Sequence, residues 1–218
     1  MKKIFFPLGL IVALAMLFIS WSEDIPKHEA VDLGLPSGVK WATCNVGANS
    51  PEEYGGYYAW GETEEKSNYD VSTYKWCNVS CGTLTKYCTN SDYGTVDNKT
   101  VLDPEDDVAH VKWGGDWRMP TTEEQRELLN NCTWEWTSFN GVNGYKVTGP
   151  NGNSIFLPAA GYCYGNVVSY GDTFGCYWSC SLYSNDCDRA YHLGFNDGGY
   201  DWYSDSRYFG LSVRPVLE

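Results

Sequence analysis

The sequence predicts an α+β domain with short antiparallel strands, two helices and long irregular loops. From Ala30 onward the apolar runs are short and are broken by Gly, Pro, Asn and Asp, which is typical of antiparallel strands. Helix signals occur at two places, both before the last third of the chain. Residues 62–105 are polar and irregular, which favours surface loops. A chain of 218 residues has room for one sizeable domain and a leader.

The expected strands begin with a hairpin. Residues 31–35 and 39–42 flank Pro36-Ser37-Gly38, which is a turn signal. Residues 57–60 are rich in aromatic side chains and form the next candidate strand. The later candidate strands are 145–148, 154–157, 177–181, 190–195 and 212–216.

Two helices are expected between these groups of strands. Thr121 and Glu124 have the spacing of a capping box, in which each side chain binds the other residue's backbone N–H. Leu128 and Leu129 then supply an apolar stripe, and the helix is expected to end at Asn131. The other helix is expected over residues 104–112, with acidic side chains in the first turn, where the helix dipole favours them.

The first 21 residues are expected to be an export signal. Lys2 and Lys3 precede an apolar run over residues 4–19, which is the pattern of a secretory signal. The end of the run resembles a bacterial lipoprotein signal, with Trp21 where a lipid-bearing Cys is expected. The acidic residues 22–24 resemble the surface-export tag of lipoproteins from Bacteroides-type bacteria. We therefore expect a linker over 22–28, a domain over 29–218, and an exported protein at the outer cell surface or secreted.

The charge of the chain excludes several classes of partner. The formal net charge is −13, and removing residues 1–21 with Lys2 and Lys3 leaves 13 basic and 28 acidic residues, or −15. Nucleic acids and anionic membrane surfaces require clusters of Lys and Arg. We therefore expect no nucleic-acid partner, and contact with a membrane only through the N-terminal signal or anchor.

The C-terminal part has an unusual composition. Residues 147–217 contain no Lys, Glu, Gln or Met, although Lys and Glu normally dominate a solvated surface. In residues 162–212, forty of fifty-one positions are Tyr, Ser, Gly, Asp, Cys, Asn, Phe or His. Antibody paratopes use a similar set, because Tyr gives rigid contact area while Ser, Gly and Asn give adaptable hydrogen bonding. A Gly/Tyr-rich solvent face with no partner is the alternative.

Two kinds of position alternate in this stretch. Randomising the two adenines of an Asn codon yields residues such as Tyr, Asp, His, Ser, Cys, Gly and Phe, but never Lys, Glu, Gln, Met or Trp. The positions that lie between the expected framework residues carry residue types that this rule allows. The positions expected to be framework are Trp178, Ala190, Leu193, Phe195, Trp202, Arg207, Val213, Arg214 and Pro215.

Several motifs in the chain resemble the Fibrobacter succinogenes major paralogous domain family, in that family's order. They are Val31–Gly38, Trp41–Ala48, Trp60–Glu62, Trp113–Thr121, Leu157–Gly161, Tyr177–Ser179 and Ser212–Val216. This resemblance implies a C-type lectin-like fold and a structural role for Trp41, Trp60, Trp113, Trp117 and Trp178. The stretch 162–212 resembles the variable region of proteins targeted by diversity-generating retroelements, in which adenine-directed mutagenesis rewrites a ligand-binding face.

The resemblance implies a non-catalytic protein that binds a protein or glycan on another cell, a phage or a host. No cofactor or metal is expected. The alternating pattern places Leu193 and Phe195 inward, and His192, Gly194 and Asn196 on an exposed face. The expected ligand-binding residues are Tyr183, Asn185, Asp186, Asp188, His192, Asn196, Asp197, Tyr200, Asp201, Tyr203, Ser204, Asp205, Tyr208 and Phe209.

Three alternatives remain open from the sequence. A fixed-specificity adhesin or glycan-binding lectin would use the same fold. An oxygenase of the formylglycine-generating type would need a reactive pair such as Cys176 and Cys180. A calcium site would need an oxygen cage, for which only the acidic residues 103–107 are candidates, and a helix start explains them equally well.

The cysteines do not define a disulfide framework. Their number is nine, which is odd, so at least one is unpaired or links two chains. Four of them lie in the variable stretch, where free thiols are an expected product of diversification: Cys163, Cys176, Cys180 and Cys187. The pairing of the other five cannot be read from their spacing.

Overall fold

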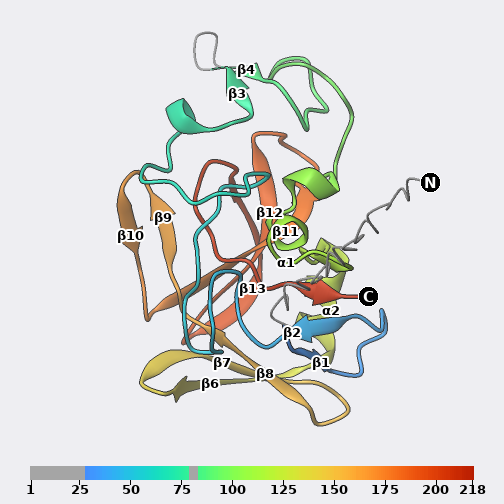
Figure 1. Ribbon diagram of the computed structural model, residues 1–218, viewed down its shortest axis with the longest axis vertical. Helices are drawn as coiled ribbons and strands as arrows, with labels where there is room; N and C mark the ends of the chain where they lie inside the picture. Colours follow the sequence, from blue (N-terminus) through green and yellow to red (C-terminus); the bar gives the residue numbers. More distant parts are fainter. Residues whose placement is uncertain (1–27, 79–82) are drawn as a thin grey trace, which may run out of the picture.

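The computed structural model describes residues 28–78 and 83–218. The expected signal, most of the linker and Cys81 lie outside the described residues. The expectation of an α+β class is wrong. Among the described residues 39% are in β structure and 12% in helices, so the protein is mostly β. The short antiparallel strands, two α-helices and long loops are present, but several small sheets build the fold (Figure 1).

A four-stranded antiparallel sheet joins the two ends of the described chain. It consists of β1 (Ala30–Asp32), β2 (Lys40–Ala42), β14 (Val216–Leu217) and β5 (Trp117–Arg118), in that order. The hairpin expected around Pro36 is therefore confirmed as β1 and β2. The expected strand 212–216 is reduced to the two residues of β14 and a single bridge between Ser212 and Tyr177.

Two three-stranded meanders carry most of the β structure. The first contains β6 (Thr133–Phe139), β7 (Val142–Thr148) and β8 (Ser154–Pro158), and lies at the bottom of Figure 1. The second contains β11 (Phe174–Leu182), β12 (Arg189–Asn196) and β13 (Gly199–Ser206). Strands were expected at β7, β8, β11 and β12, and are confirmed with longer bounds.

The remaining elements are short ribbons and turns outside these sheets. Two-stranded ribbons are formed by β3 (Cys77–Asn78) with β4 (Thr83–Leu84), and by β9 (Tyr162–Tyr164) with β10 (Val167–Ser169). A 3-10 turn, η1, spans Val71–Thr73. The strand expected at 57–60 is wrong, because that segment forms only a bridge between Tyr58 and Leu211.

Of the two expected helices, α2 begins at the predicted capping box, and the other is interrupted near its start. In α2 (Thr122–Asn131), the Thr121 side chain accepts from the backbone N–H of Glu124, and the Glu124 carboxylate accepts from that of Thr121. The other expected helix is divided into η2 (Pro104–Asp106) and α1 (Val108–Trp113). Asp107 separates the two parts because its side chain accepts from the first free N–H groups of α1.

The tryptophans of the family-like motifs form the interior. All five that were expected to be structural are buried, with exposed fractions of 7% or less. Trp60 and Trp178 also donate their indole N–H groups to backbone oxygens of Ser179 and Tyr58, at 2.9 and 2.8 Å. These contacts connect segments about 120 residues apart, so the indoles fix the packing of the N-terminal part against β11.

Two buried arginines serve as further framework residues. Arg214 donates to the side chain of Asn45 and to the backbone oxygens of Ala42 and Thr43. Arg207 reaches the backbone of residues 86, 87 and 187. Guanidinium groups suit this use because they present several donors in a fixed plane.

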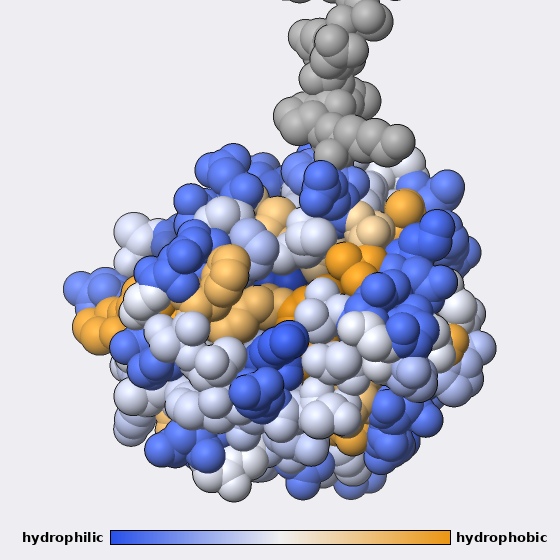
Figure 2. All heavy atoms as spheres, turned by 90° about the horizontal axis from the view of Figure 1, so that it is seen from below, coloured by the Kyte–Doolittle hydropathy of each residue, from blue (hydrophilic) through white to orange (hydrophobic). Residues whose placement is uncertain are grey.

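One face of the molecule shows how exposed apolar residues are distributed. On the face seen from below in Figure 1, hydrophobic residues lie in separate groups among hydrophilic ones (Figure 2). Among the described residues, no helix has the length and apolar character needed to cross a membrane.

Candidate ligand-binding face

The sheet β11–β12–β13 separates a packed face from an open one. On β12, Leu193 and Phe195 point into the core and are 1% and 2% exposed, as the alternating pattern predicted. His192, Gly194 and Asn196 lie on the opposite face. The register places these three across from residues 203, 201 and 199 of β13 and from residues 178, 176 and 174 of β11. One face of three strands therefore presents these residues together.

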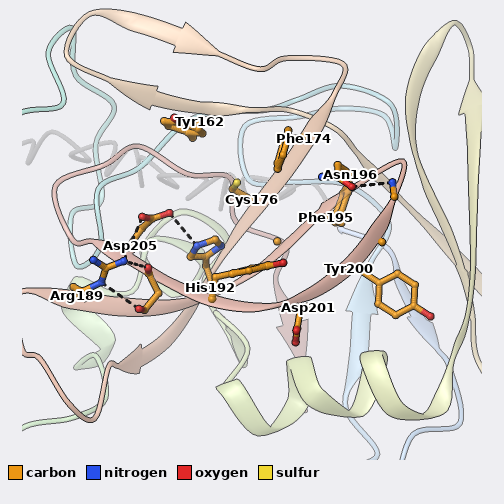
Figure 3. A pocket seen from close by; sticks show the side chains of 15 residues that line it. Tyr162, Phe174, Cys176, Arg189, His192, Phe195, Asn196, Tyr200, Asp201 and Asp205 are labelled. Atoms are coloured by element: carbon orange, nitrogen blue, oxygen red, sulfur yellow. Dashed lines mark hydrogen bonds and ion pairs between the residues drawn. The ribbon is translucent and has the colours of Figure 1, made fainter.

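A hollow of about 810 Å³ lies over this open face (Figure 3). Its volume is in the range of small-molecule sites. Of the described residues, fifteen line it, and all of them belong to the stretch 162–212. They are Tyr162, Phe174, Cys176, Arg189, His192, Gly194, Phe195, Asn196, Gly198, Gly199, Tyr200, Asp201, Tyr203, Ser204 and Asp205. None of these fifteen is Lys, Glu, Gln, Met or Trp.

One end of the hollow is polar and charged. The Asp205 carboxylate lies 3.1 Å from Nε2 of His192 and 3.7 Å from a guanidinium nitrogen of Arg189. Arg189 also donates from Nε to the Ser204 hydroxyl at 3.1 Å, which holds the guanidinium against the end of β13. Side chains with acidic and basic groups are therefore concentrated at this end (Figure 3).

His192 differs from the sequence expectation. It was expected to be exposed, but it is 3% exposed and lies at the floor of the hollow. The Trp178 indole packs edge-on against its ring, and the Tyr203 ring stacks on it at a centroid distance of 5.9 Å. Its Nδ1 is 3.3 Å from the Leu193 backbone oxygen. Its Nε2 is buried and faces the Asp205 carboxylate at 3.1 Å, although the two atoms are not aligned as a regular hydrogen bond.

Aromatic rings surround the rest of the hollow. Tyr162 and Phe174 lie on the side of β9 and β11, and Tyr203 comes from β13. Tyr200, also on β13, is at the edge of the hollow, and its ring stacks on that of Trp134 at a centroid distance of 4.4 Å. Gly194 is needed beside Tyr203, because a Cβ at this position would come within 2.6 Å of the Tyr203 ring. The missing side chain lets the Tyr203 ring lie flat across β12. The hollow therefore combines aromatic surface with a few convergent polar groups, as binding sites commonly do.

Seven of the fourteen residues expected to bind a ligand meet in this hollow: His192, Asn196, Tyr200, Asp201, Tyr203, Ser204 and Asp205. Asp197 is exposed in the turn between β12 and β13, at the rim. Phe209 stacks on Tyr162 with nearly parallel rings 5.8 Å apart, and Tyr208 packs against Phe209. These three residues are therefore peripheral to the hollow.

The other four expected residues lie in the connection between β11 and β12, away from the hollow. Tyr183 packs edge-on against Tyr191, and Asn185 donates to the Tyr183 hydroxyl. Burial and then the neighbouring Asp186 carboxylate raise the pKa of Asp188. The structure thus divides the expected binding residues into a hollow with its rim and a separate loop.

Trp202 was expected to be framework, but it is 37% exposed. It lies on the face opposite the hollow, where the guanidinium of Arg126 from α2 is 4.5 Å from its ring. Its side chain therefore packs on the helix side of the sheet, although solvent reaches one face of the ring.

The cysteines considered for the oxygenase alternative do not have the features of an activated nucleophile. Burial raises the pKa of Cys176 and of Cys180 to about 12. Both are therefore thiols at neutral pH, whereas an activated nucleophile is a thiolate. Cys176 shares the hollow with His192 and Asp205, but in the described part of the chain its sulfur forms no hydrogen bond with His192. A thiol nucleophile needs such a base in contact.

The acidic cluster that was considered as a calcium site forms ion pairs with lysine side chains. The carboxylates of Asp103, Glu105 and Asp106 lie within 4.8 Å of one another. Lys86 lies 2.6 Å from both Asp103 and Asp106, and Lys75 is 2.9 Å from Asp106. These ion pairs neutralise the cluster internally, and hydrogen bonding from Lys86 is the main reason that the pKa of Asp103 is lowered.

Sequence reasoning did not select several residues of the hollow, including Tyr162, Phe174, Cys176 and Arg189. Phe174, Cys176 and Arg189 join the site through the register of the sheet β11–β12–β13. Tyr162 joins it because single bridges on either side of this residue, at Gly161 and Cys163, hold β9 beside β11 and Gly210. Membership of the stretch 162–212 was the one signal that could have identified them.

Residues 134–216 match a family model described as a domain of unknown function (DUF8237). The match extends from β6 to β14 and includes every residue of the hollow. No curated protein and no solved structure matches the chain.

Proposed function

We propose that this chain is a non-catalytic, surface-displayed binding protein whose C-terminal face is diversified by a retroelement. The observation that carries the proposal is the composition of the hollow. All fifteen described residues that line it belong to the compositionally unusual stretch, and none is of a type that an Asn codon cannot yield through adenine changes. A site built by such mutagenesis would have this composition.

The separation of roles within the sheet supports the same proposal. Leu193 contributes to the core beneath β12 and does not line the hollow, while His192 and Asn196 line the hollow on the other face of the same strand. The two tryptophans of the sheet do not line the hollow: Trp178 is buried, and Trp202 packs on the other face. A face whose side chains contribute little to the core can be rewritten without loss of the fold.

The expected ligand is a protein or a glycan on another cell, a phage or a host surface. The aromatic rings of the hollow offer rigid contact area, and the group formed by Arg189, His192 and Asp205 offers charged hydrogen bonding. Display outside the cell is part of the proposal and rests on the signal-like residues 1–21. A fixed-specificity lectin or adhesin would use the same hollow. The two functions differ in whether the codons for the residues of the hollow vary, and not in the geometry of the site.

A binding screen tests the function. The full chain is applied to arrays of glycans and to surface extracts of bacterial, phage and host origin, and the affinity for a captured ligand is then measured for variants. Tyr203→Ser removes a side chain that is 53% exposed over the hollow. A hot spot contributes 2 kcal/mol or more, which corresponds to a loss of affinity of about 30-fold.

Phe139→Ser is the matched control, because Phe139 is an aromatic residue on β6 that is 42% exposed and does not line this hollow. The control is expected to bind like the parent. Binding that weakens in Phe139→Ser but not in Tyr203→Ser would place the ligand elsewhere and contradict the proposal. So would the absence of any ligand among all the surfaces tested.

A further inference from the structure

Two cysteines from distant parts of the chain meet in the core. Cys88 follows β4, and Cys187 lies in the connection between β11 and β12. They are 99 positions apart in the sequence, yet their sulfur atoms lie 3.2 Å from each other. Both side chains are buried, with exposed fractions of 0% and 1%.

The backbone on both sides of the sulfur pair is held in place. One guanidinium nitrogen of Arg207 donates to the backbone oxygen of Cys187 at 2.9 Å and to that of Tyr87 at 3.1 Å. On the other side, the Asp97 carboxylate accepts from the backbone N–H of Cys88 at 2.9 Å. The two thiols therefore face each other because the fold fixes both chain segments, independently of any bond between the sulfurs.

We propose that Cys88 and Cys187 form an intrachain disulfide when the protein meets a disulfide-bearing oxidant. The distance between the sulfur atoms must shrink by only about 1 Å to reach the disulfide length of about 2.05 Å. Oxidising compartments outside the cytosol maintain such bonds, so the inference agrees with the proposed export but does not depend on the ligand-binding function.

The chemistry is thiol–disulfide exchange. The thiolate of one cysteine attacks the oxidant's disulfide and forms a mixed disulfide, releasing one thiol. The second cysteine then displaces the remaining half of the oxidant. In total two S–H bonds of the protein are lost and one S–S bond forms, while the oxidant is reduced to two thiols.

Oxidation is expected to occur while the chain folds rather than after it has packed. Burial and the contact with Cys187 raise the pKa of Cys88, so the reactive thiolate is scarce in the folded protein. Before packing is complete both thiols are accessible to the oxidant, and Arg207 then brings their backbones together. The bond would tie the loop that carries Asn185 and Asp186 to the N-terminal half of the fold.

Peptide mapping of the full chain tests the inference. The chain is reduced, refolded in a mixture of reduced and oxidised glutathione, alkylated, digested and analysed by mass spectrometry. We expect a linked peptide pair containing Cys88 and Cys187, and the loss of alkylation at these two positions. Cys132→Ser is the control and is expected to retain the link, because Cys132 lies at the end of α2, away from the pair.

Two results would overturn the inference. One is alkylation of both cysteines in refolded protein, and the other is a link from either of them to a different cysteine. Cys88→Ser is expected to leave Cys187 alkylated. If that variant does not fold, the peptide map of the parent protein still decides the question.

Discussion

Replacement of Leu193 by alanine is expected to destabilise the fold by about 3 kcal/mol, within the range of about 2–5 kcal/mol found for buried leucines. Leu193 is 1% exposed and belongs to the apolar cluster beneath β12. Its backbone pairs with Tyr177 on one side and Trp202 on the other. The surrounding strands are held on both sides, so they cannot collapse into the space that the truncated side chain leaves.

Such a loss is large relative to the total stability of a domain, which is about 5–15 kcal/mol. For a chain of this size each kcal/mol shifts the melting temperature by about 2–4 °C, so Leu193→Ala is expected to melt about 6–12 °C below the parent. Asp201→Ser, on the open face of the neighbouring strand, is the matched control. Asp201 is exposed, so its loss is expected to change stability by no more than about 0.5 kcal/mol.

Urea unfolding followed by circular dichroism gives both free energies directly, and thermal melting gives the shift in temperature. Leu193→Ala is expected to be clearly less stable than Asp201→Ser. If Leu193→Ala unfolds at the same urea concentration as the parent, or if Asp201→Ser is the less stable variant, then the assignment of a packed and an open face to this sheet is wrong.

Three further predictions concern the framework. Trp178→Phe loses the indole hydrogen bond to Tyr58 and is expected to lower the free energy of unfolding in urea by about 1–3 kcal/mol; an unchanged value would contradict the structural role of the indole. Burial raises the pKa of Glu124, but hydrogen bonds from Arg118 outweigh this and hold it below its ordinary value of 4.5. The resulting stability is present above pH 4.5 and lost as the pH falls through the lower folded-state pKa, so Glu124→Gln should flatten the acid side of a stability–pH curve. The Cys88–Cys187 disulfide closes a loop of about 100 residues and should add about 4.7 kcal/mol, so dithiothreitol should lower the urea midpoint of the oxidised parent and leave that of Cys88→Ser unchanged.

Elements that are stabilised by residues close together in the sequence could be predicted. The capping box at Thr121 and Glu124 predicted the start of α2, and the turn around Pro36 predicted the first hairpin. In both cases the partners lie within a few positions of each other. The alternation along β12 likewise predicted which face Leu193 would occupy.

Elements that depend on distant partners were not predictable. Residues 57–60 have the composition of a strand, but the N–H of Tyr58 binds Leu211 and that of Trp60 binds Arg207, four positions away, whereas an antiparallel ladder advances two residues at a time. No continuous ladder forms, so no strand results. The α+β class failed for a related reason, because β6 and β13 gain their regularity from pairing with neighbouring strands.

Sequence patterns also did not predict how deeply a side chain is buried. Alternation placed His192 on the correct face, but its burial results from Tyr203, which lies across the strand pair and stacks on its ring. The position of Arg189 beside Asp205 follows from the register of β12 and β13, which places Ala190 opposite Asp205. That register is fixed by the whole hairpin and not by any local signal.

Sequencing the gene across a population of the producing cells distinguishes a diversified face from a fixed one. We predict that codons differ between cells at positions of the hollow such as His192, Asn196, Asp201 and Tyr203. The changes should fall where a near-identical template repeat has adenines, and a reverse transcriptase gene should lie nearby. The codons of buried Leu193 should remain constant. A population with identical codons across 162–212, or with changes spread equally over buried and open positions, would contradict a diversified binding face.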